Sequence, residues 1–139
     1  MREIKFRGKR VVNGEWVYGY YEETVNNGNH FYWINVLNGD FNDVIPETVG
    51  QYTGLKDKNG VEIYEGDIVT SGHLVTYSTG RGRWFSDVGV VRHDTRNGCL
   101  IIDNDDGRPK RLTVKVIKDN RVQVIGNISD NPELMEEKK

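Results

Sequence analysis

Asn-Gly pairs recur along this chain and constrain its fold more than any other feature of the sequence. Five such pairs and one Asp-Gly pair divide the 139 residues, at positions 13–14, 27–28, 38–39, 59–60, 97–98 and 106–107. Both members of an Asn-Gly pair tolerate a positive φ angle, which two-residue hairpin turns require. Short segments between such turns predict a mainly β protein built from antiparallel hairpins.

Strand patterns fill the first half of the chain. The first Asn-Gly pair separates alternating apolar segments at residues 4–6 and 16–20, which predicts a hairpin with an aromatic-rich face. The apolar run at residues 30–37 predicts a strand that crosses the centre of a sheet. Pro46 cannot donate a ladder hydrogen bond, so it predicts a sheet edge or a strand end.

The second half of the chain is expected to add further strands and a short helix. Residues 71–86 carry three glycines and only isolated apolar side chains, which predicts either a mobile excursion or an extended hairpin. Asn131 followed by Pro132 is typical of a helix start, so a short C-terminal helix is expected. The clearest alternation, at residues 112–116, supports the fourth of the expected strands, which are at residues 65–70, 88–93, 99–103, 111–117 and 122–125.

Residues 51–69 connect the two halves. Their polar side chains allow two interpretations, a binding surface or a set of local structural contacts; they are Gln51, Thr53, Lys56, Asp57, Glu65 and Asp67. In the structural interpretation, which we favour, Asp57 shapes a turn and Asp67 accepts backbone hydrogen bonds at the start of a strand. The apolar side chains would then hold the connector against the barrel; they are Tyr52, Leu55, Ile63 and Tyr64.

Three segments carry a family resemblance: residues 1–7 (MREIKFR), 49–69 (VGQYTGLKDKNGVEIYEGDIV) and 124–134 (VIGNISDNPEL). They resemble the opening, hallmark and closing segments of the YopX family of phage and prophage proteins. The resemblance implies a mostly β fold with an SH3-like barrel in its later part, and it implies no activity because the family is uncharacterised. The matching connector residues are Gln51, Tyr52, Thr53, Gly54, Leu55, Asp57, Gly60, Ile63, Tyr64, Gly66 and Asp67.

Together these patterns predict one domain composed of an antiparallel hairpin lobe, an SH3-like small barrel and a short C-terminal helix. The lobe is expected at residues 1–50 and the connector at 51–69. The barrel is expected at 70–128, with a loop near 71–86 that looks like an insertion relative to the family. The short helix and tail would occupy 129–139.

Composition narrows the cellular setting and the classes of function. With 19 basic and 21 acidic residues the net charge is −2, so there is no global electrostatic case for a nucleic-acid binder. No apolar run reaches membrane-spanning length, and the protein is expected in the cytoplasm of a bacterial host of a phage or prophage. The lone Cys99 precedes an apolar strand and is expected to be a buried, inert thiol.

The sequence assigns no catalytic, cofactor-binding or metal-ligating residue, and no small-molecule cofactor is expected. The three histidines, His30, His73 and His93, lack the companion spacing of metal sites. The acidic turn at residues 103–107 resembles a calcium loop but has Val114 where a bidentate Glu is needed. A hydrolase that uses this turn and His93 would require a divalent metal between them.

Two functions from different classes remain as hypotheses. The leading one is a non-enzymatic binding or assembly module, in which aromatic-rich surfaces contact a partner protein or a second copy; the residues singled out are Trp16, Tyr20, Tyr21 and Trp33. The alternative is nucleic-acid binding, in which Arg81 and Arg83 grip phosphates and Trp84 stacks on a base.

Overall fold

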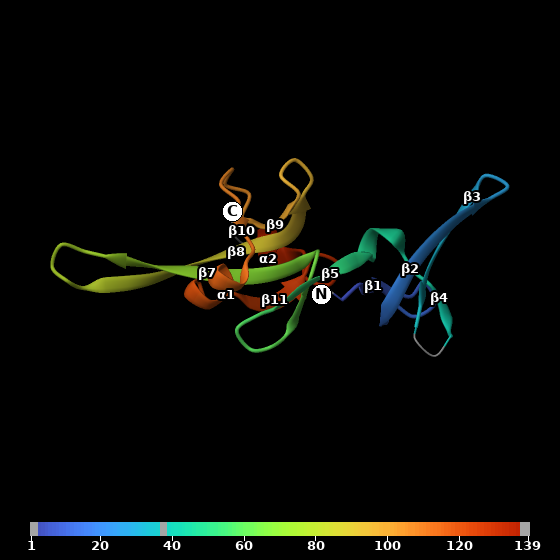
Figure 1. Ribbon diagram of the computed structural model, residues 1–139, viewed down its shortest axis with the longest axis horizontal. Helices are drawn as coiled ribbons and strands as arrows, with labels where there is room; N and C mark the ends of the chain where they lie inside the picture. The colour runs from blue at the N-terminus through green and yellow to red at the C-terminus, as the bar shows by residue number, and fades with distance from the viewer. Residues whose placement is uncertain (1–2, 37–38, 137–139) are drawn as a thin grey trace. The chain divides into compact units, whose positions relative to one another are not determined.

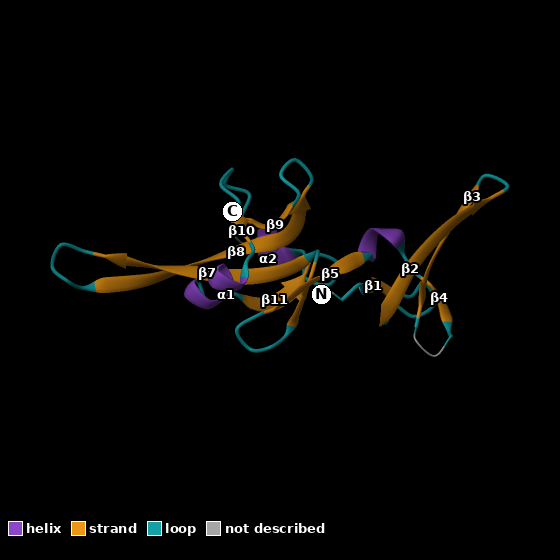
Figure 2. Ribbon diagram, in the orientation of Figure 1, coloured by secondary structure: helices purple, strands orange, loops and turns teal. Residues whose placement is uncertain are grey.

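The fold consists almost entirely of antiparallel β strands. The computed structural model describes residues 3–36 and 39–136, and the chain divides into two compact units, Met1–Gly54 and Leu55–Lys139. Strands dominate both units, and α helices are short wherever they occur in the described ranges (Figures 1 and 2). The mainly β fold expected from the sequence is therefore confirmed.

The strands in the first part of the chain are neighbours in the order β4-β3-β2-β1-β5. The boundary between the two units falls within β5. The elements of this part of the chain are β1 (Phe6–Lys9), β2 (Trp16–Asn26), β3 (Asn29–Asn35), β4 (Phe41–Asp43), the 3-10 helix η1 (Pro46–Thr48) and β5 (Gly50–Lys56).

A tight turn at Asn27 and Gly28 joins β2 to β3. Their φ angles are 52° and 81°, so both residues have the positive φ that the sequence predicted for this turn. The strands pair from Asn26 opposite Asn29 down to Tyr20 opposite Asn35. Because directly opposite residues point to the same side of a sheet, this register decides which side chains gather on each face.

Ile34 lies at the centre of the core of the first unit and is fully buried. A Cβ at Gly8 or Gly19 would lie 3.2 or 3.3 Å from the Ile34 side chain, so glycine lets β1 and β2 approach it closely. β3 is an interior strand, between β2 and β4, but it lies next to the edge strand rather than at the predicted centre of the sheet. Its first three residues are nevertheless exposed, because β4 pairs only with its last three.

The second unit contains a five-stranded sheet in the order β10-β9-β8-β7-β11. Residues 71–86 form an extended hairpin, which was one of the two predicted alternatives: β7 and β8 pair from Ile68 opposite Val90 to Thr76 opposite Gly82. The strands of this part are β6 (Glu62–Tyr64), β7 (Asp67–Thr76), β8 (Gly82–Asp94), β9 (Cys99–Asp103), β10 (Lys110–Arg111) and β11 (Gln123–Asn127). The buried core comprises Ile63, Val69, Val91, Ile102, Leu112, Ile117 and Val122.

The prediction of a strand at residues 111–117 is wrong, because the chain forms the helix α1 (Val114–Asp119) there, after the two residues of β10. The Thr113 hydroxyl accepts a hydrogen bond from the Val116 N–H at 3.1 Å and caps the helix. The apolar alternation was misleading: Val114 is 70% exposed, whereas Ile117, from the opposite side of the expected strand, is buried. The fourth expected strand is thus reduced to the two residues of β10.

The C-terminal helix is present as α2 (Glu133–Glu136). The side chain of Asn131 accepts a hydrogen bond from the Asn127 N–H at 3.3 Å and so faces the preceding turn rather than the helix. Cys99 begins β9 and is half-buried rather than fully buried. The turn expected at 38–39 lies partly outside the described residues.

Replacing the cap of α1 provides a test of this unpredicted helix. Thr113→Ala should lower the free energy of unfolding by about 1 kcal/mol, because the Val116 N–H loses its acceptor. Thr113→Ser should retain most of the stability. Urea unfolding of the three proteins measures the difference, and equal midpoints for wild type and Thr113→Ala would contradict the cap.

Candidate functional site

The carboxylate of Asp57 organises the connector through backbone contacts. It is buried, and its Oδ1 accepts hydrogen bonds from the N–H groups of Asn59 at 2.8 Å and Val61 at 2.9 Å. Its Oδ2 accepts one from the Val124 N–H at 2.9 Å. The turn that follows contains Gly60 at φ 81°. Both carboxylate oxygens of Asp57 therefore accept hydrogen bonds from the backbone and stabilise the fold.

Asp67 plays a similar part at the start of β7. It is 1% exposed, and its Oδ2 accepts a hydrogen bond from the Tyr64 N–H at 2.7 Å. Gly66, at φ 92°, donates its N–H to the Val91 carbonyl and accepts from the Ile128 N–H, both at 2.9 Å. The turn at residues 65–66 is thus tied to two other segments.

The remaining motif residues also have structural surroundings. Gln51 pairs with Phe6 across β5 and β1, and Gly54 has φ 84° inside β5. Leu55 packs against the core of the second unit. Four others are buried, namely Tyr52, Thr53, Ile63 and Tyr64. These contacts support the structural interpretation of the motif.

Removing the Asp57 carboxylate should therefore affect stability strongly. Asp57→Ala should lower the free energy of unfolding by about 3 kcal/mol, because buried N–H groups lose a charged acceptor. Asp119→Ala removes an exposed carboxylate of α1 and serves as the matched control, with a change near zero. Urea unfolding gives both values, and equal losses in the two variants would refute this role.

The residues proposed for nucleic-acid contact do not converge. Arg83 and Trp84 are adjacent in β8, so their side chains point to opposite faces of the hairpin, and Arg81 precedes the strand. The Arg83 guanidinium lies 5.1 Å from the centre of the Phe85 ring, which in turn stacks with His73 at 5.8 Å.

The Trp84 ring contacts two other segments of the second unit and stays 38% exposed. A Cβ at Gly72 would overlap the ring, so the indole lies directly on the backbone of β7. The Arg121 guanidinium lies 4.4 Å from the ring centre. Trp84 thus joins the hairpin to Arg121, just after the end of α1, and a base that stacked where Arg121 lies would have to displace it.

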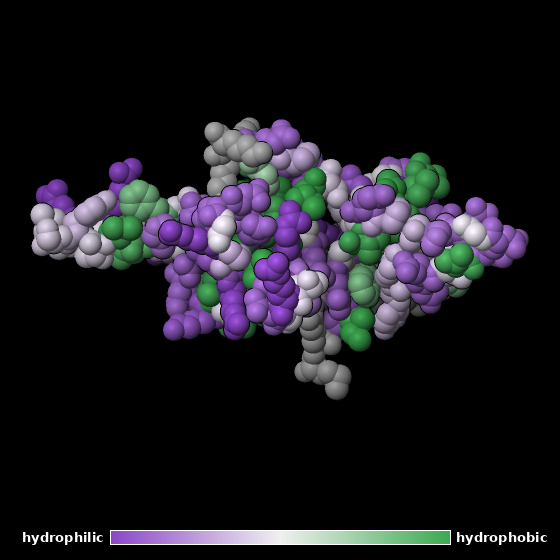
Figure 3. Space-filling model, turned by 90° about the horizontal axis from the view of Figure 1, so that it is seen from above, coloured by the Kyte–Doolittle hydropathy of each residue, from purple (hydrophilic) through white to green (hydrophobic). Residues whose placement is uncertain are grey.

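An aromatic face forms on one side of the sheet of the first unit. Alternation along β2 and the pairing of β1, β3 and β4 with it place six rings on this side. Four of them are prominently exposed: Tyr18 at 47%, Tyr20 at 50%, Phe31 at 45% and Phe41 at 66%. We call this set the aromatic face; it consists of Trp16, Tyr18, Tyr20, Phe31, Trp33 and Phe41. Figure 3 shows hydrophobic patches among hydrophilic ones on the surface.

Charged side chains hold several of these rings. Arg7 and Lys9 lie over Trp16, with 4.8 and 5.6 Å from their charged groups to the ring centre. The Trp33 indole N–H donates to Glu22 Oε2 at 2.8 Å. The face therefore has basic side chains along β1 and an acidic side chain, Glu22, on β2.

A shallow hollow adjoins the aromatic face. Its volume is about 110 Å³, and Tyr18 and Tyr20 line it together with Ile4, Lys5 and Val36. Its volume matches that of one apolar side chain. All its described lining residues come from the first unit.

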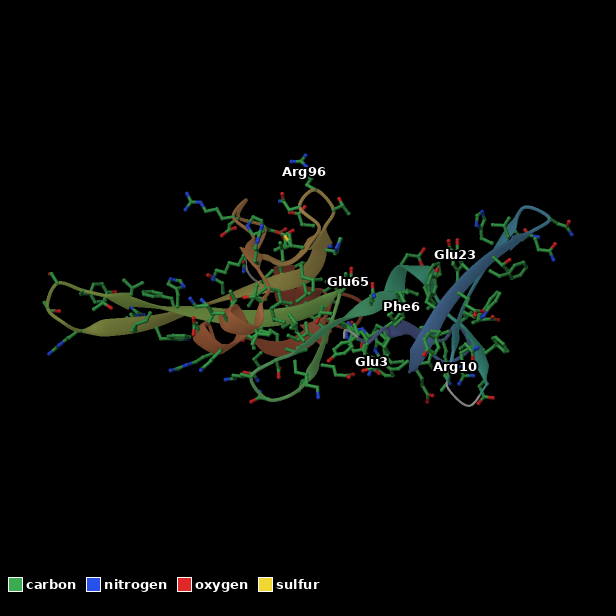
Figure 4. The ribbon with its side chains drawn as sticks, viewed as in Figure 1. Glu3, Phe6, Arg10, Glu23, Glu65 and Arg96 are labelled. Carbon is green, nitrogen blue, oxygen red and sulfur yellow. The ribbon has the colours of Figure 1, made fainter. Side chains whose placement is uncertain are left out.

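Of the four aromatic residues singled out from the sequence, the structure places three on this face and one elsewhere. Tyr21 lies on the opposite side of β2, where its ring centre is 5.8 Å from that of Phe6; Figure 4 labels Phe6 and Glu23 in this unit. The Tyr21 hydroxyl donates to Glu23 Oε2 at 2.9 Å. Burial, this hydrogen bond and the Glu23 charge raise the pKa of Tyr21 to about 12.

Sequence reasoning placed Tyr18 on the aromatic-rich face of the first hairpin without singling it out for contact, and it missed Phe31 and Phe41 as members of the face. The signal for Tyr18 was the same alternation that selected Trp16 and Tyr20. Phe31 follows from the two-residue turn at residues 27–28, which fixes the pairing of β3 with β2.

The residues considered for metal chemistry are dispersed. Among residues 3–36 and 39–136 no group of three or more His, Cys, Asp or Glu side chains could hold a metal ion. His93 lies in β8 opposite Leu100, and Asp103 Oδ2 is 3.5 Å from the Arg92 side chain. The structure thus offers no set of ligands for the hydrolase hypothesis within the described residues.

Comparison with known proteins identifies the family. The sequence model of the YopX family, described as YopX protein, matches residues 5–136. The chain belongs to the YopX family. Among solved structures, this YopX family member is similar to protein EF1440 from Enterococcus faecalis, known from a crystal structure, with 24% sequence identity and a TM-score of 0.49. That match covers 97% of this chain and 99% of the other.

Two further findings concern this YopX family member. No curated protein matches it. In the described part of the chain, no helix has the length and apolar character needed to span a membrane.

Proposed function

We propose that the protein is a non-enzymatic binding module, encoded by a bacteriophage or prophage, that contacts a partner protein through the aromatic face. The observation that carries this proposal is the gathering of six aromatic side chains on one side of a single sheet. Tyr and Trp at such density are typical of the energetic centres of protein interfaces. Four rings with more than two fifths of their surface exposed leave a large apolar area in water.

The charged groups of the face support binding rather than catalysis. Lys5 lies over Tyr52 at 5.1 Å, Arg7 and Lys9 lie over Trp16, and Glu22 accepts from Trp33. Each of these groups contacts a ring and so holds it in place. The partner that fits is a protein surface with an apolar side chain for the hollow beside Tyr18 and Tyr20 and acidic groups along the β1 side.

Substituting two exposed rings of the face tests this proposal. Tyr20→Ser combined with Phe41→Ser should reduce capture of the partner by about tenfold, because both rings leave the contact surface. The matched control combines Tyr77→Ser with Leu74→Ser, which are exposed to similar extents in the second unit. Tagged proteins are expressed in bacteria carrying the phage or prophage, and captured proteins are compared by quantitative mass spectrometry.

The decisive step uses the purified partner. Calorimetric titration should show the weakened affinity for the face variant and unchanged affinity for the control. If no protein distinguishes the two variants, or if the purified partner binds both equally, the aromatic face is not the contact surface.

Single-stranded nucleic acid is the second candidate ligand, because residues 70–86 contain Arg81, Arg83 and His73 but no acidic side chain. Arg81→Gln with Arg83→Gln should then abolish salt-dependent binding of a labelled oligonucleotide, measured by fluorescence anisotropy. Arg96→Gln with Arg108→Gln removes the same charge elsewhere and should bind like wild type; Figure 4 labels Arg96 at the β8–β9 turn. Equal loss in both variants would indicate nonspecific attraction.

A further inference from the structure

One side of β8 is an open sheet edge. β7 pairs with β8 from Gly82 to Val90, but β9 pairs with β8 only from Val90 onward. Over residues 82–87 the far side of β8 has no ladder partner in the described part of the chain. This stretch contains no proline, lysine or register shift, which are among the devices that block an exposed edge, although it does carry the charged residues Arg83 and Asp87.

The contacts of Gly72 show which backbone N–H and carbonyl groups of β8 point to the open side. Its N–H donates to the Asn120 carbonyl, and its carbonyl accepts from the Asn120 side-chain Nδ2, both at 2.7 Å, so both groups point away from β8. Opposite residues of an antiparallel pair either exchange both bonds or neither. Ser86, opposite Gly72, therefore directs its N–H and carbonyl to the open side, and Trp84, two residues away, does the same.

The charges along this edge are self-complementary. Arg83 and Asp87 lie two residues to either side of Phe85 and point to the same face as its ring. Asp87 has no described hydrogen-bond or ion-pair partner, and the Arg83 guanidinium lies 5.1 Å from the centre of the Phe85 ring. At about 3.3 Å per residue the two are too far apart to pair within one strand.

We propose that a second copy of this chain pairs with the open edge, β8 against β8, in an antiparallel arrangement centred on Phe85. Two-fold symmetry then places Arg83 of each copy opposite Asp87 of the other, and the two Phe85 rings face each other. Trp84 of each copy meets Ser86 of the other, with the outward N–H and carbonyl groups exchanging hydrogen bonds.

The neighbouring registers fit less well. Centring on Ser86 places Phe85 opposite Asp87 and leaves Arg83 opposite Gly89. Centring on Trp84 places Asp87 opposite Arg81, which lies outside β8 in the turn. The pairing extends no further than Val88, whose carbonyl accepts from Asn104 Nδ2 at 2.8 Å. A short edge of this kind predicts a weak dimer with a micromolar dissociation constant.

This dimer is independent of the proposed function but would add to it. Two joined copies present two aromatic faces, so a partner that repeats its docking site would be held by both. The two proposals can fail separately, because Tyr20→Ser with Phe41→Ser changes no residue of the β8 edge.

Charge exchange tests the register. Arg83→Asp and Asp87→Arg should each raise the dissociation constant of the dimer by about tenfold, because like charges then face each other at both symmetric positions. An equimolar mixture of the two variants should recover a dimer of wild-type affinity. Sedimentation equilibrium from low to high micromolar concentration measures the dissociation constants of the wild type, the two variants and their mixture. A wild-type protein that stays monomeric, or a mixture that is no tighter than its components, would overturn the proposal.

Proline substitution tests the edge itself. Ser86→Pro removes an N–H that points to the open side, so it should abolish the dimer while circular dichroism shows a folded chain. Thr76→Pro is the matched control, because Thr76 lies opposite Gly82 with its N–H on the far side of β7, and it should dimerise normally. Should Ser86→Pro fail to fold, hydrogen exchange in the wild type decides: the Trp84 and Ser86 amides must gain protection with concentration, and Leu74 must not.

Discussion

Asp57 joins the connector to β11 across 67 residues of sequence, and the second unit depends on this contact. A buried carboxylate is stable only when its lone pairs are used, and here backbone N–H groups of the turn and of β11 use them. The neighbouring Lys58 N–H donates to the Val122 carbonyl at 3.0 Å. These two contacts hold β11 and the residue before it against the start of the second unit, and β11 also pairs with β7.

The sequence was informative wherever a local rule fixes the geometry. The Asn27-Gly28 turn sets the β2 and β3 register, and that register explains why Trp33 joins Tyr20 while Tyr21 faces Phe6. The turn at residues 65–66 and the strand after it follow equally from local turn chemistry. Local rules failed at residues 112–117, where strand alternation and a capped helix both satisfied the pattern and burial of Ile117 decided for the helix.

The candidate surfaces were less predictable because they depend on distant contacts. Which amides of β8 face outward is decided by Asn120, 48 residues from Gly72 in the sequence. The contact of Trp84 with Arg121 likewise joins two separate elements. Composition could suggest that Arg83 and Trp84 act together, but once residues 82–94 are known to form a strand, their adjacency places them on opposite faces.

The β7–β8 hairpin has a consequence for how related chains can differ in length. Its outer half, from His73 to Phe85, lies beyond the buried core, since its side chains are largely exposed. Residues could be gained or lost there without disturbing Val69 or Val91. Such changes must occur in steps of two per strand, because a single added residue would exchange the two faces. Related chains can therefore differ in the length of this hairpin while the core and the connector stay the same.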